Sequence, residues 1–362
     1  CITTETLPLV PYLWPYPKPG NRAGYSPAIS FSASPSALGS RGPGRLLGGN
    51  DAVTKIAFLF PGQGSAAVGM GAELLEREAL VRERFHYVSK LADRDLAQLA
   101  LQGPEETLVA TEYAQPAIFA LAASCLDLFR DRTGNAAVFY AGHSLGEYTA
   151  LYAAAALSWE EAAALVVRRG QAIANACRHN PGTMAAILGL EDNAVVEICE
   201  EASSHGTVVP ANFNCPGQVV ISGTVEGVAK ASELAKDRGG KASPLKVSGA
   251  FHSPLVAPAG EEMASVLATA DLRPPLATFV PNVTGKPESD PERIRELLVK
   301  QIAHPVRWTA TMELLVAGEA DAALEFGHGR VLAGMLKKVK RDFPVYNIYD
   351  EASLAAVVAD LR

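Results

Sequence analysis

The stretch Gly142-His-Ser-Leu-Gly-Glu-Tyr-Thr-Ala-Leu-Tyr-Ala-Ala-Ala155 has a serine between two glycines, followed by residues that favour a helix. Its pattern Gly-x-Ser-x-Gly, centred on Ser144, is weak evidence alone because a glycine-rich chain produces it by chance. The flanking residues say more: residues 136–141 form an apolar run of strand length, and residues 145–156 are rich in Ala, Leu and Glu, which favour a helix. A strand, a sharp turn and a helix in this order are the setting of a nucleophile elbow. The context therefore predicts that Ser144 is a nucleophile rather than a structural turn serine.

The two glycines of the pattern support this interpretation. Gly142 and Gly146 let the backbone turn tightly and let the strand and helix pack closely. The first turn of the helix presents backbone N–H groups that have no partner within the helix, and these can stabilise an oxyanion formed at the serine.

The composition is that of a globular protein with two or three packed units, since 48% of the 362 residues are hydrophobic. A net charge of −7, with no zinc-finger spacing, gives no reason to expect a nucleic-acid partner. The longest apolar stretches, 117–126 and 149–159, are shorter than the roughly 20 residues that cross a bilayer, so no membrane partner is expected. Five scattered cysteines without a C-x-x-C pair, and no HExxH motif, predict reduced thiols and no metal site.

Residues 1–50 differ from the rest, with eight prolines and Glu5 as their only acid. This composition predicts a disordered leader or linker. An acid-poor segment with Ser and Arg is also typical of an organelle transit peptide. The expected location is therefore the cytoplasm, with the mitochondrion or plastid as the alternative if this segment is a transit peptide.

Alternating strands and helices predict an α/β subdomain with a parallel sheet over residues 51–180 and 250–362. A buried strand is expected at Lys55–Phe60, ended by the turn-forming Pro61-Gly-Gln-Gly64. The other expected elements of this subdomain are helices at 72–92, 115–130 and 159–177, strands around Phe139 and at 278–282 and 322–326, and a helix at 331–339.

Residues 181–249 change pattern and predict a smaller, inserted unit. The expected order is a strand at 184–190, a helix at 193–204, strands at 208–214 and 218–222, a helix at 225–238 and a strand at 243–248. This βαββαβ order is that of a ferredoxin-like subdomain. A cleft between the two subdomains is the natural place for a substrate.

A serine nucleophile needs a base, and two histidines are candidates. His252 lies between Gly249 and Pro254, where the inserted unit returns the chain to the large subdomain, and is the first choice. His328 is the rival, since hydrolases with this elbow place their histidine late in the chain, after an acid such as Asp321. The rival arrangement would make the protein a serine esterase or thioesterase.

Six motifs occur in order between about residues 54 and 345. They are Phe60-Pro-Gly-Gln-Gly-Ser65, Gly142-His-Ser-Leu-Gly-Glu147, Arg169-Gly170, Asn212-Phe-Asn214 with Pro216-Gly-Gln-Val219, Gly249-Ala-Phe-His252, and Gln301 followed by His304-Pro-Val-Arg-Trp308. Together they resemble the malonyl-CoA:acyl-carrier-protein transacylase family. The resemblance implies a larger hydrolase-like subdomain and a smaller ferredoxin-like one, which agrees with the pattern of strands and helices.

The resemblance also implies a reaction. Ser144 would take the malonyl group from malonyl-CoA and pass it to the phosphopantetheine thiol of an acyl carrier protein, with His252 as base and acid in turn. Fatty-acid synthesis is the expected pathway, and a stand-alone acyltransferase of a polyketide synthase is the alternative. No cofactor is expected beyond the coenzyme A of the substrate and the phosphopantetheine of the carrier, and the chain could act as a monomer.

By the same resemblance, other residues receive roles. The backbone carbonyl of Gln301 would orient His252, and Gln63 with the Leu145 N–H would form the oxyanion hole. Arg169 would bind the malonyl carboxylate, since a guanidinium pairs with a carboxylate that an acetyl thioester lacks. Arg168 is not followed by glycine and is expected to be a solvated helix residue.

The remaining expectations concern selectivity and docking. Leu145 and Phe251 resemble the malonyl-selective pattern of the family, and a phenyl ring could fill the space that an α-methyl group needs. Asn214 would steady the loop or touch the pantetheine arm, and His143 would line the pocket. The basic run Lys337-Lys-Val-Lys-Arg341 could steer an acidic carrier protein or be a solvated helix end.

Overall fold

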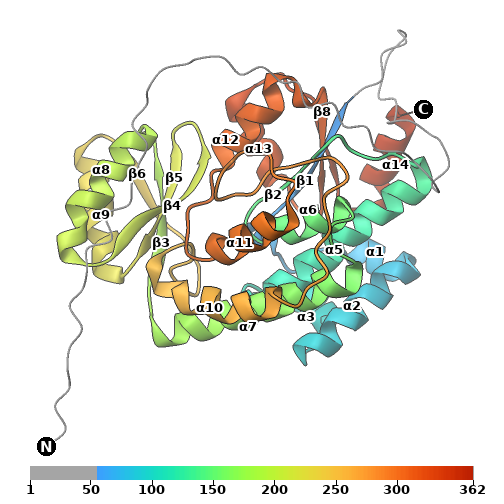
Figure 1. Cartoon of the computed structure of the whole chain (residues 1–362), viewed down its shortest axis with the longest axis horizontal. Helices are drawn as coiled ribbons and strands as arrows, with labels where there is room; N and C mark the ends of the chain where they lie inside the picture. The colour runs from blue at the N-terminus through green and yellow to red at the C-terminus, as the bar shows by residue number, and fades with distance from the viewer. Residues whose placement is uncertain (1–54, 362) are drawn as a thin grey trace, which may run out of the picture. The chain divides into compact units, whose positions relative to one another are not determined.

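A computed structural model describes residues 55–361 of the chain. Its larger sheet has five strands in the order β7-β2-β1-β8-β9 (Figure 1). These strands are β1 (Ile56–Phe60), β2 (Phe139–Gly142), β7 (Thr278–Phe279), β8 (Ala322–Phe326) and β9 (Val345–Ile348). Every neighbouring pair is parallel, which confirms the predicted parallel sheet.

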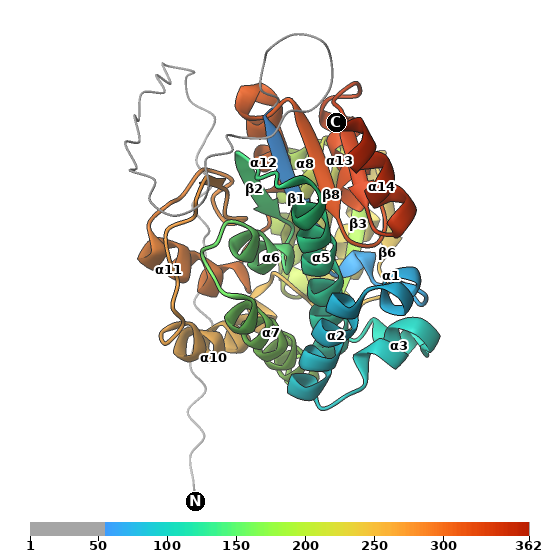
Figure 2. The ribbon, with the colours of Figure 1, turned by 90° about the vertical axis from the view of Figure 1, so that its right-hand side faces the viewer.

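Helices cover both faces of this sheet, because alternate residues of β1 point into two separate cores. Phe58 and Phe60 pack with α2 (Ala79–Ala92), α5 (Thr111–Thr133), α6 (Gly146–Ala153) and α7 (Trp159–His179), several of which lie in front of the sheet in Figure 2. Ala57 and Leu59 pack with α12 (Trp308–Leu314) and α13 (Val331–Val339). A strand buried on both faces is typical of a parallel sheet, and it explains why β1 is apolar throughout.

Shorter elements complete the large part. They are α1 (Ala72–Arg77), α3 (Leu96–Gln102), α4 (Glu105–Leu108), α10 (Ala257–Leu267), α11 (Pro291–Gln301), α14 (Glu351–Asp360), two 3₁₀ turns at Gln63–Ser65 and Pro254–Val256, and a π turn at Leu315–Glu319. Among residues 55–361, no helix is long and apolar enough to cross a membrane.

The smaller sheet has four antiparallel strands in the order β4-β5-β3-β6. They are β3 (Thr183–Leu188), β4 (Val208–Cys215), β5 (Gln218–Gly223) and β6 (Lys241–Pro244). The helices α8 (Asp192–Ala202), α9 (Val225–Asp237) and a 3₁₀ turn at Ser203–His205 belong to the same part, and both helices pack on one face of the sheet, seen at the left of Figure 1. The chain order and sheet order are those of the predicted ferredoxin-like fold.

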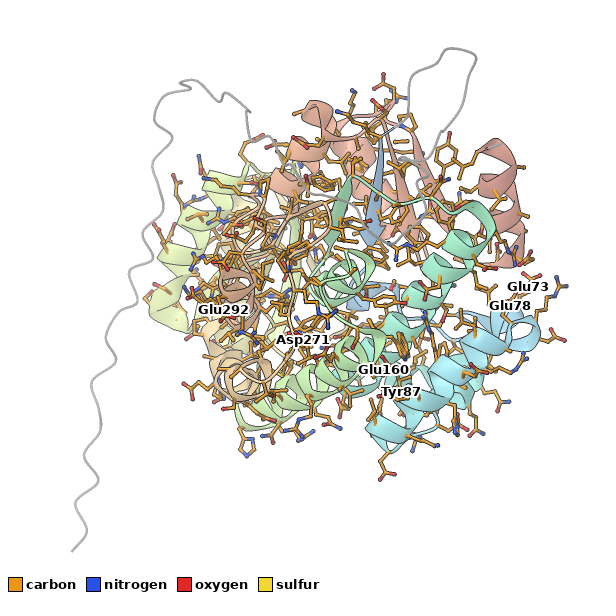
Figure 3. All side chains as sticks on the ribbon, turned by 45° about the vertical axis from the view of Figure 1, so that its right-hand side comes forward. Glu73, Glu78, Tyr87, Glu160, Asp271 and Glu292 are labelled. Carbon is orange, nitrogen blue, oxygen red and sulfur yellow. The ribbon has the colours of Figure 1, made fainter. Side chains whose placement is uncertain are left out.

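The structure differs from the sequence prediction in the bounds of several elements. The helix expected over 72–92 is broken at Glu78, which has extended backbone angles and lies where α1 meets α2 (Figure 3). The guanidinium of Arg82 satisfies the carbonyl groups of Leu75 and Glu76 there, so the first helix can end. The strand expected at 243–248 covers Lys241–Pro244 instead, and the last bond of its ladder to β3 runs from the Leu245 N–H to the Met184 carbonyl at 3.0 Å.

The strand expected at 278–282 is also shorter than predicted, since β7 holds only Thr278 and Phe279. The subdomain boundaries at 180/181 and 249/250 stay predictions, with the smaller sheet running from Thr183 to Pro244. The predicted disordered leader, residues 1–50, lies outside the described residues.

Candidate active site

Ser144 lies on a tight turn between β2 and α6, with a left-handed backbone at φ 52°. A Cβ atom at Gly142 would lie 1.9 Å from the backbone of Gly146, and one at Gly146 would lie 2.1 Å from the carbonyl oxygen of Phe60. Only glycine therefore permits this approach of helix to strand. The Ser144 N–H donates to the Asn282 Oδ1 at 2.6 Å, and the Asn282 amide donates to the Gly142 carbonyl at 2.7 Å. These bonds hold a conformation that is strained for serine.

Ser144 and His252 are in direct contact. The Ser144 Oγ lies 2.8 Å from His252 Nε2, and His252 Nδ1 lies 2.8 Å from the backbone oxygen of Gln301. A carbonyl oxygen can only accept, so the ring proton is on Nδ1, and Nε2 is free to accept the serine proton. Burial, reinforced by the charge of Arg169, lowers the pKa of His252 to about 3, which keeps the imidazole neutral at neutral pH with Nε2 unprotonated.

Arg169 is the only arginine in contact with the serine hydroxyl among the described residues. Its Nη2 donates to Ser144 Oγ at 3.1 Å and to the Gln301 Oε1 at 2.8 Å, while Nη1 donates to Gln115 Oε1 at 2.6 Å. The side chain is 2% exposed, and its Nε–H has no hydrogen-bond partner within residues 55–361. Burial lowers the pKa of this guanidinium below its usual range. A buried cation held by neutral acceptors retains the capacity to pair with an anion.

Arg168, by contrast, lies at the surface as expected. Its Nη2 is 3.0 Å from the Glu262 carboxylate, and 51% of its side chain is exposed. The two neighbouring arginines on α7 therefore have different surroundings, and only Arg169 reaches the serine.

Glu147 is a buried acidic residue that holds two other residues of the site in place. Glu147, in the first turn of α6, accepts from the backbone N–H of Asn282 and from Gln301 Nε2, the latter at 2.6 Å. Gln301 Nε2 also donates to the Ser144 carbonyl at 2.8 Å. Burial raises the pKa of Glu147 to about 8, against the opposing effects of the Asn282 N–H and Arg169.

A cavity of about 330 Å³ lies over the serine, between the two sheets. Its lining includes the predicted site residues Gln63, His143, Ser144, Leu145, Arg169, Asn214, Phe251 and His252. Gln301 lies beneath them, fully buried. Strand β4 supplies Asn214 and helix α13 supplies Val331 and Met335, so both parts of the chain form the walls.

The remaining predicted residues have defined contacts. His143 Nε2 lies 2.9 Å from Asn214 Oδ1, and burial lowers the pKa of His143. Gln63 Nε2 donates to the carbonyl of Val109 at 3.0 Å. In the turn after the elbow, the N–H groups of residues 146–148 bond to nearby carbonyls, whereas the Leu145 N–H finds no such acceptor in the described part of the chain. Leu145 immediately precedes α6, where such an N–H can bind an anion.

The rival pair of His328 and Asp321 does not form. Asp321 precedes β8 and accepts from the backbone N–H of Lys55 at 2.8 Å, whereas His328 follows the other end of β8. A strand of five residues separates the two by about 16 Å. Neither residue lines the cavity. The rival esterase arrangement is therefore wrong, and His252, the first choice, is the histidine in contact with Ser144.

Three residues of the site were not predicted from the sequence. Glu147 and Gln115 are buried within helices, and Asn282 follows β7, which is paired with β2. Asn282 had a usable signal, because residues after neighbouring parallel strands meet at one edge of the sheet. The described residues contain no cluster of three or more His, Cys, Asp or Glu side chains suited to a metal ion.

The comparisons with known proteins give first a class and then a family. Residues 57–361 match the profile of the family described as the acyl transferase domain. The malonyl CoA-acyl carrier protein transacylase of Bacillus subtilis is 39% identical over 86% of this chain and 98% of its own length. The chain belongs to the malonyl CoA-acyl carrier protein transacylase family, a branch of the acyl transferases.

Solved structures agree with this assignment. The acyl-carrier-protein S-malonyltransferase of Burkholderia pseudomallei has a TM-score of 0.80 and 40% identity, covering 84% of this chain and 99% of its own. A malonyl-transacylase solved in complex with a type II PKS acyl-carrier protein has a TM-score of 0.81 and 37% identity, covering 85% and 100%. The two-part fold is thus that of its relatives.

Proposed function

We propose that this chain transfers the malonyl group of malonyl-CoA to the phosphopantetheine thiol of an acyl carrier protein through a malonyl-Ser144 intermediate. One observation carries the proposal most directly: a buried arginine donates to the hydroxyl of an elbow serine whose other neighbour is a neutral histidine. The names of the relatives support the same reaction, since they are malonyl transacylases of carrier proteins.

The chemistry takes place in two half-reactions. Ser144 Oγ attacks the thioester carbonyl carbon and gives its proton to His252 Nε2, and the carbon–sulfur bond then breaks as the imidazolium returns this proton to the departing coenzyme A thiolate. In the second half, the pantetheine thiol gives its proton to His252 and attacks the acyl-serine carbonyl. The serine oxygen leaves and regains the proton from His252.

The surrounding groups stabilise charge during these steps. The Leu145 N–H and the Gln63 turn form the oxyanion hole, and loss of one such donor typically slows a reaction about 10²- to 10³-fold. Gln301 orients His252 through its backbone carbonyl, at the 2.8 Å contact described above. The neutral carbonyl takes the place that an aspartate has in a Ser-His-Asp triad.

Arg169 selects the acyl group. A malonyl thioester brings a free carboxylate into the cavity, where the unpartnered Nε–H of Arg169 donates to it and Nη2 exchanges its 3.1 Å bond to Ser144 Oγ for a second bond to the carboxylate. An acetyl thioester has no carboxylate for these donors. Phe251, on the cavity wall, fills the space of an α-methyl group and so disfavours methylmalonyl.

We propose further roles for other residues of the chain. His143 and Asn214, hydrogen bonded to each other, shape the entry for the pantetheine arm. The basic run 337–341 steers an acidic carrier, no resident cofactor is needed, and the chain acts as a monomer. We expect fatty-acid synthesis in the cytoplasm, or in a mitochondrion or plastid if residues 1–50 are a transit peptide. The polyketide alternative has support from the relative that was solved with a type II PKS carrier.

Intact-mass spectrometry tests the proposal. The wild-type protein is incubated briefly with malonyl-CoA and then with a holo acyl carrier protein, beside the variants Ser144→Ala, His252→Ala and His328→Ala. Wild type and His328→Ala are expected to gain one malonyl group and pass it to the carrier, whereas Ser144→Ala gains none. A malonyl adduct on Ser144→Ala, or loading lost in His328→Ala and retained in His252→Ala, would contradict the proposal.

A further inference from the structure

An unbroken line of hydrogen bonds joins Arg169 to Gln63 through two residues that the mechanism does not use. Arg169 Nη1 donates to Gln115 Oε1 at 2.6 Å, and Gln115 Nε2 donates to Thr111 Oγ1 at 2.7 Å. The Thr111 hydroxyl then donates to Gln63 Oε1 at 2.8 Å. Gln63 Nε2 ends the line on the Val109 carbonyl at 3.0 Å.

The chemistry of each member fixes the direction of the line. An arginine can only donate, so Gln115 must present its oxygen to Arg169 and its NH₂ group to Thr111. The threonine oxygen accepts this bond and sends its own proton to Gln63. Gln63 then has its oxygen occupied and turns its NH₂ group to the carbonyl of Val109. The orientation of both amides therefore follows from the charge at Arg169.

Most residues of this line are buried, so each of their hydrogen bonds needs a partner within the protein. Thr111 is 0% exposed, and Gln115 and Arg169 are each 2% exposed, so water cannot replace a missing partner. Thr111 and Gln115 are four residues apart at the start of α5 and lie on the same face of that helix. A single rigid helix end thus carries both links between the guanidinium and the turn that follows β1.

We propose that Thr111 and Gln115 are positioning residues that set the Gln63 turn in register with Arg169, so that the oxyanion donors and the carboxylate-binding group are placed by one common support. This inference rests on the proposed function, because it assigns Gln63 and Arg169 the roles argued above. It predicts that a change at Thr111, which contacts Gln63, and a change at Gln115, which contacts Arg169, alter kcat and KM differently.

Cutting the line at Thr111 frees the Gln63 turn and leaves the bond between Gln115 and Arg169. Thr111→Val removes the hydroxyl with little change in shape, and Thr111→Ser keeps it. We expect kcat for malonyl transfer to fall about tenfold in Thr111→Val with KM for malonyl-CoA unchanged, and to recover in Thr111→Ser. Acetyl transfer should slow by the same factor, since the oxyanion is common to both substrates.

Changing Gln115 affects the cation itself. Gln115→Glu places a carboxylate on Arg169 Nη1, which neutralises the charge that the substrate carboxylate needs. Gln115→Glu also lacks the NH₂ group that donates to Thr111, so acetyl transfer should slow about as much as in Thr111→Val. KM for malonyl-CoA should in addition rise at least tenfold, so the preference for malonyl over acetyl falls. A role in packing alone would lower both activities together.

The experiment is steady-state transfer to a holo acyl carrier protein from malonyl-CoA and acetyl-CoA, with thermal unfolding measured for wild type, Thr111→Val, Thr111→Ser and Gln115→Glu. The inference is supported if Thr111→Val lowers kcat for both substrates, Thr111→Ser restores it, and Gln115→Glu lowers the preference for malonyl. These comparisons are made between proteins that unfold within a few degrees of wild type. It is overturned if Thr111→Val and Thr111→Ser have equal kcat, or if Gln115→Glu keeps the malonyl preference. Absence of a malonyl adduct on the wild-type protein is a different result, which overturns the proposed function instead.

Discussion

Glu147 takes no part in the reaction, but it is hydrogen bonded to two residues that contact the rest of the site. Its two oxygens accept from the Asn282 N–H and from Gln301 Nε2. Asn282 holds the backbone of Ser144, and Gln301 contacts both His252 and Arg169. A group that accepts at both oxygens, with donors on either side, is suited to a carboxylate and poorly suited to an amide.

Glu147→Gln tests this at the scale of one residue. The amide has a single oxygen, so its NH₂ group must face one of two donors, and the partner left without an acceptor moves. We expect malonyl loading of Ser144 to slow roughly ten- to a hundredfold in rapid-quench measurements. Glu160→Gln is the matched control, because Glu160 lies exposed in the first turn of α7 (Figure 3) and should load at the wild-type rate. Equal rates for the two variants would show that Glu147 does not position the site.

At the scale of elements, the elbow depends on the distance between α6 and β1. Gly146 is the contact point, where an added Cβ would meet the Phe60 carbonyl at 2.1 Å. That carbonyl also accepts from the His143 N–H at 3.0 Å, so it has no room to move without disturbing the turn itself. The packing of α6 on β1 therefore also fixes the position of Ser144.

Gly146→Ala should separate α6 from β1. We expect the free energy of unfolding to fall by about 1–3 kcal/mol or more, with loss of malonyl loading because Ser144 is displaced. The matched control is Gly334→Ala in α13, where nothing lies within 4 Å of the added Cβ, and where alanine should raise helix stability by up to about 1 kcal/mol. Urea denaturation of both variants checks the signs, and a Gly146→Ala protein as stable and active as wild type would contradict the close contact.

At the scale of the whole molecule, the buried histidine links stability to pH. Burial and Arg169 lower the pKa of His252 from its ordinary 6.5 to about 3. Between these two values the unfolded chain binds a proton that the folded protein does not, so this contribution to stability is lost as the pH falls below 6.5. Glu147 acts with the opposite sign, because burial raises its pKa, although the donors at its two oxygens and Arg169 oppose that rise and favour the carboxylate.

Comparing wild type with His252→Gln isolates the histidine, since the contribution of Glu147 is common to both proteins. We expect the wild-type free energy of unfolding to fall relative to the variant by up to about 1.4 kcal/mol per pH unit below pH 6.5. Urea denaturation at several pH values from 7 to 5 measures this difference. Parallel curves for the two proteins would mean that His252 titrates alike in the folded and unfolded chains.

Local patterns in the sequence were sufficient for much of the fold. The apolar run before Ser144 and the glycines around it specify β2, the turn and α6, because each needs only neighbouring residues. The alternation between Thr183 and Pro244 predicted the ferredoxin-like order for the same reason. Element ends were less predictable, since the break at Glu78 depends on Arg82, whose side chain returns from the next helix to reach the carbonyls of α1.

The contact between Ser144 and His252 was predictable from the turn residues around each of them, whereas Arg169 was singled out by the resemblance to the family's Arg-Gly motif. Gln115, Glu147 and Asn282 escaped prediction because their roles depend on contacts between elements far apart in the chain. Asn282 touches Ser144 across 138 positions, and Gln301 touches Glu147 across 154. Spacing along a single sequence does not specify such contacts, although the place of Asn282 at the end of a predicted strand did indicate the sheet edge at which Ser144 lies.

The central claim is that Ser144 is acylated by a thioester whose carboxylate binds Arg169. Its most direct test is the rate of acyl-enzyme formation from malonyl-CoA and from acetyl-CoA, measured by intact mass for wild type and Arg169→Ala. We predict that the variant loads malonyl at least about a hundredfold more slowly and that acetyl loading falls far less, because Ser144 Oγ loses its bond from Arg169 with either substrate but only the malonyl group also loses a carboxylate partner. Malonyl loading unchanged in Arg169→Ala, or an equal loss for both acyl groups, would contradict the account.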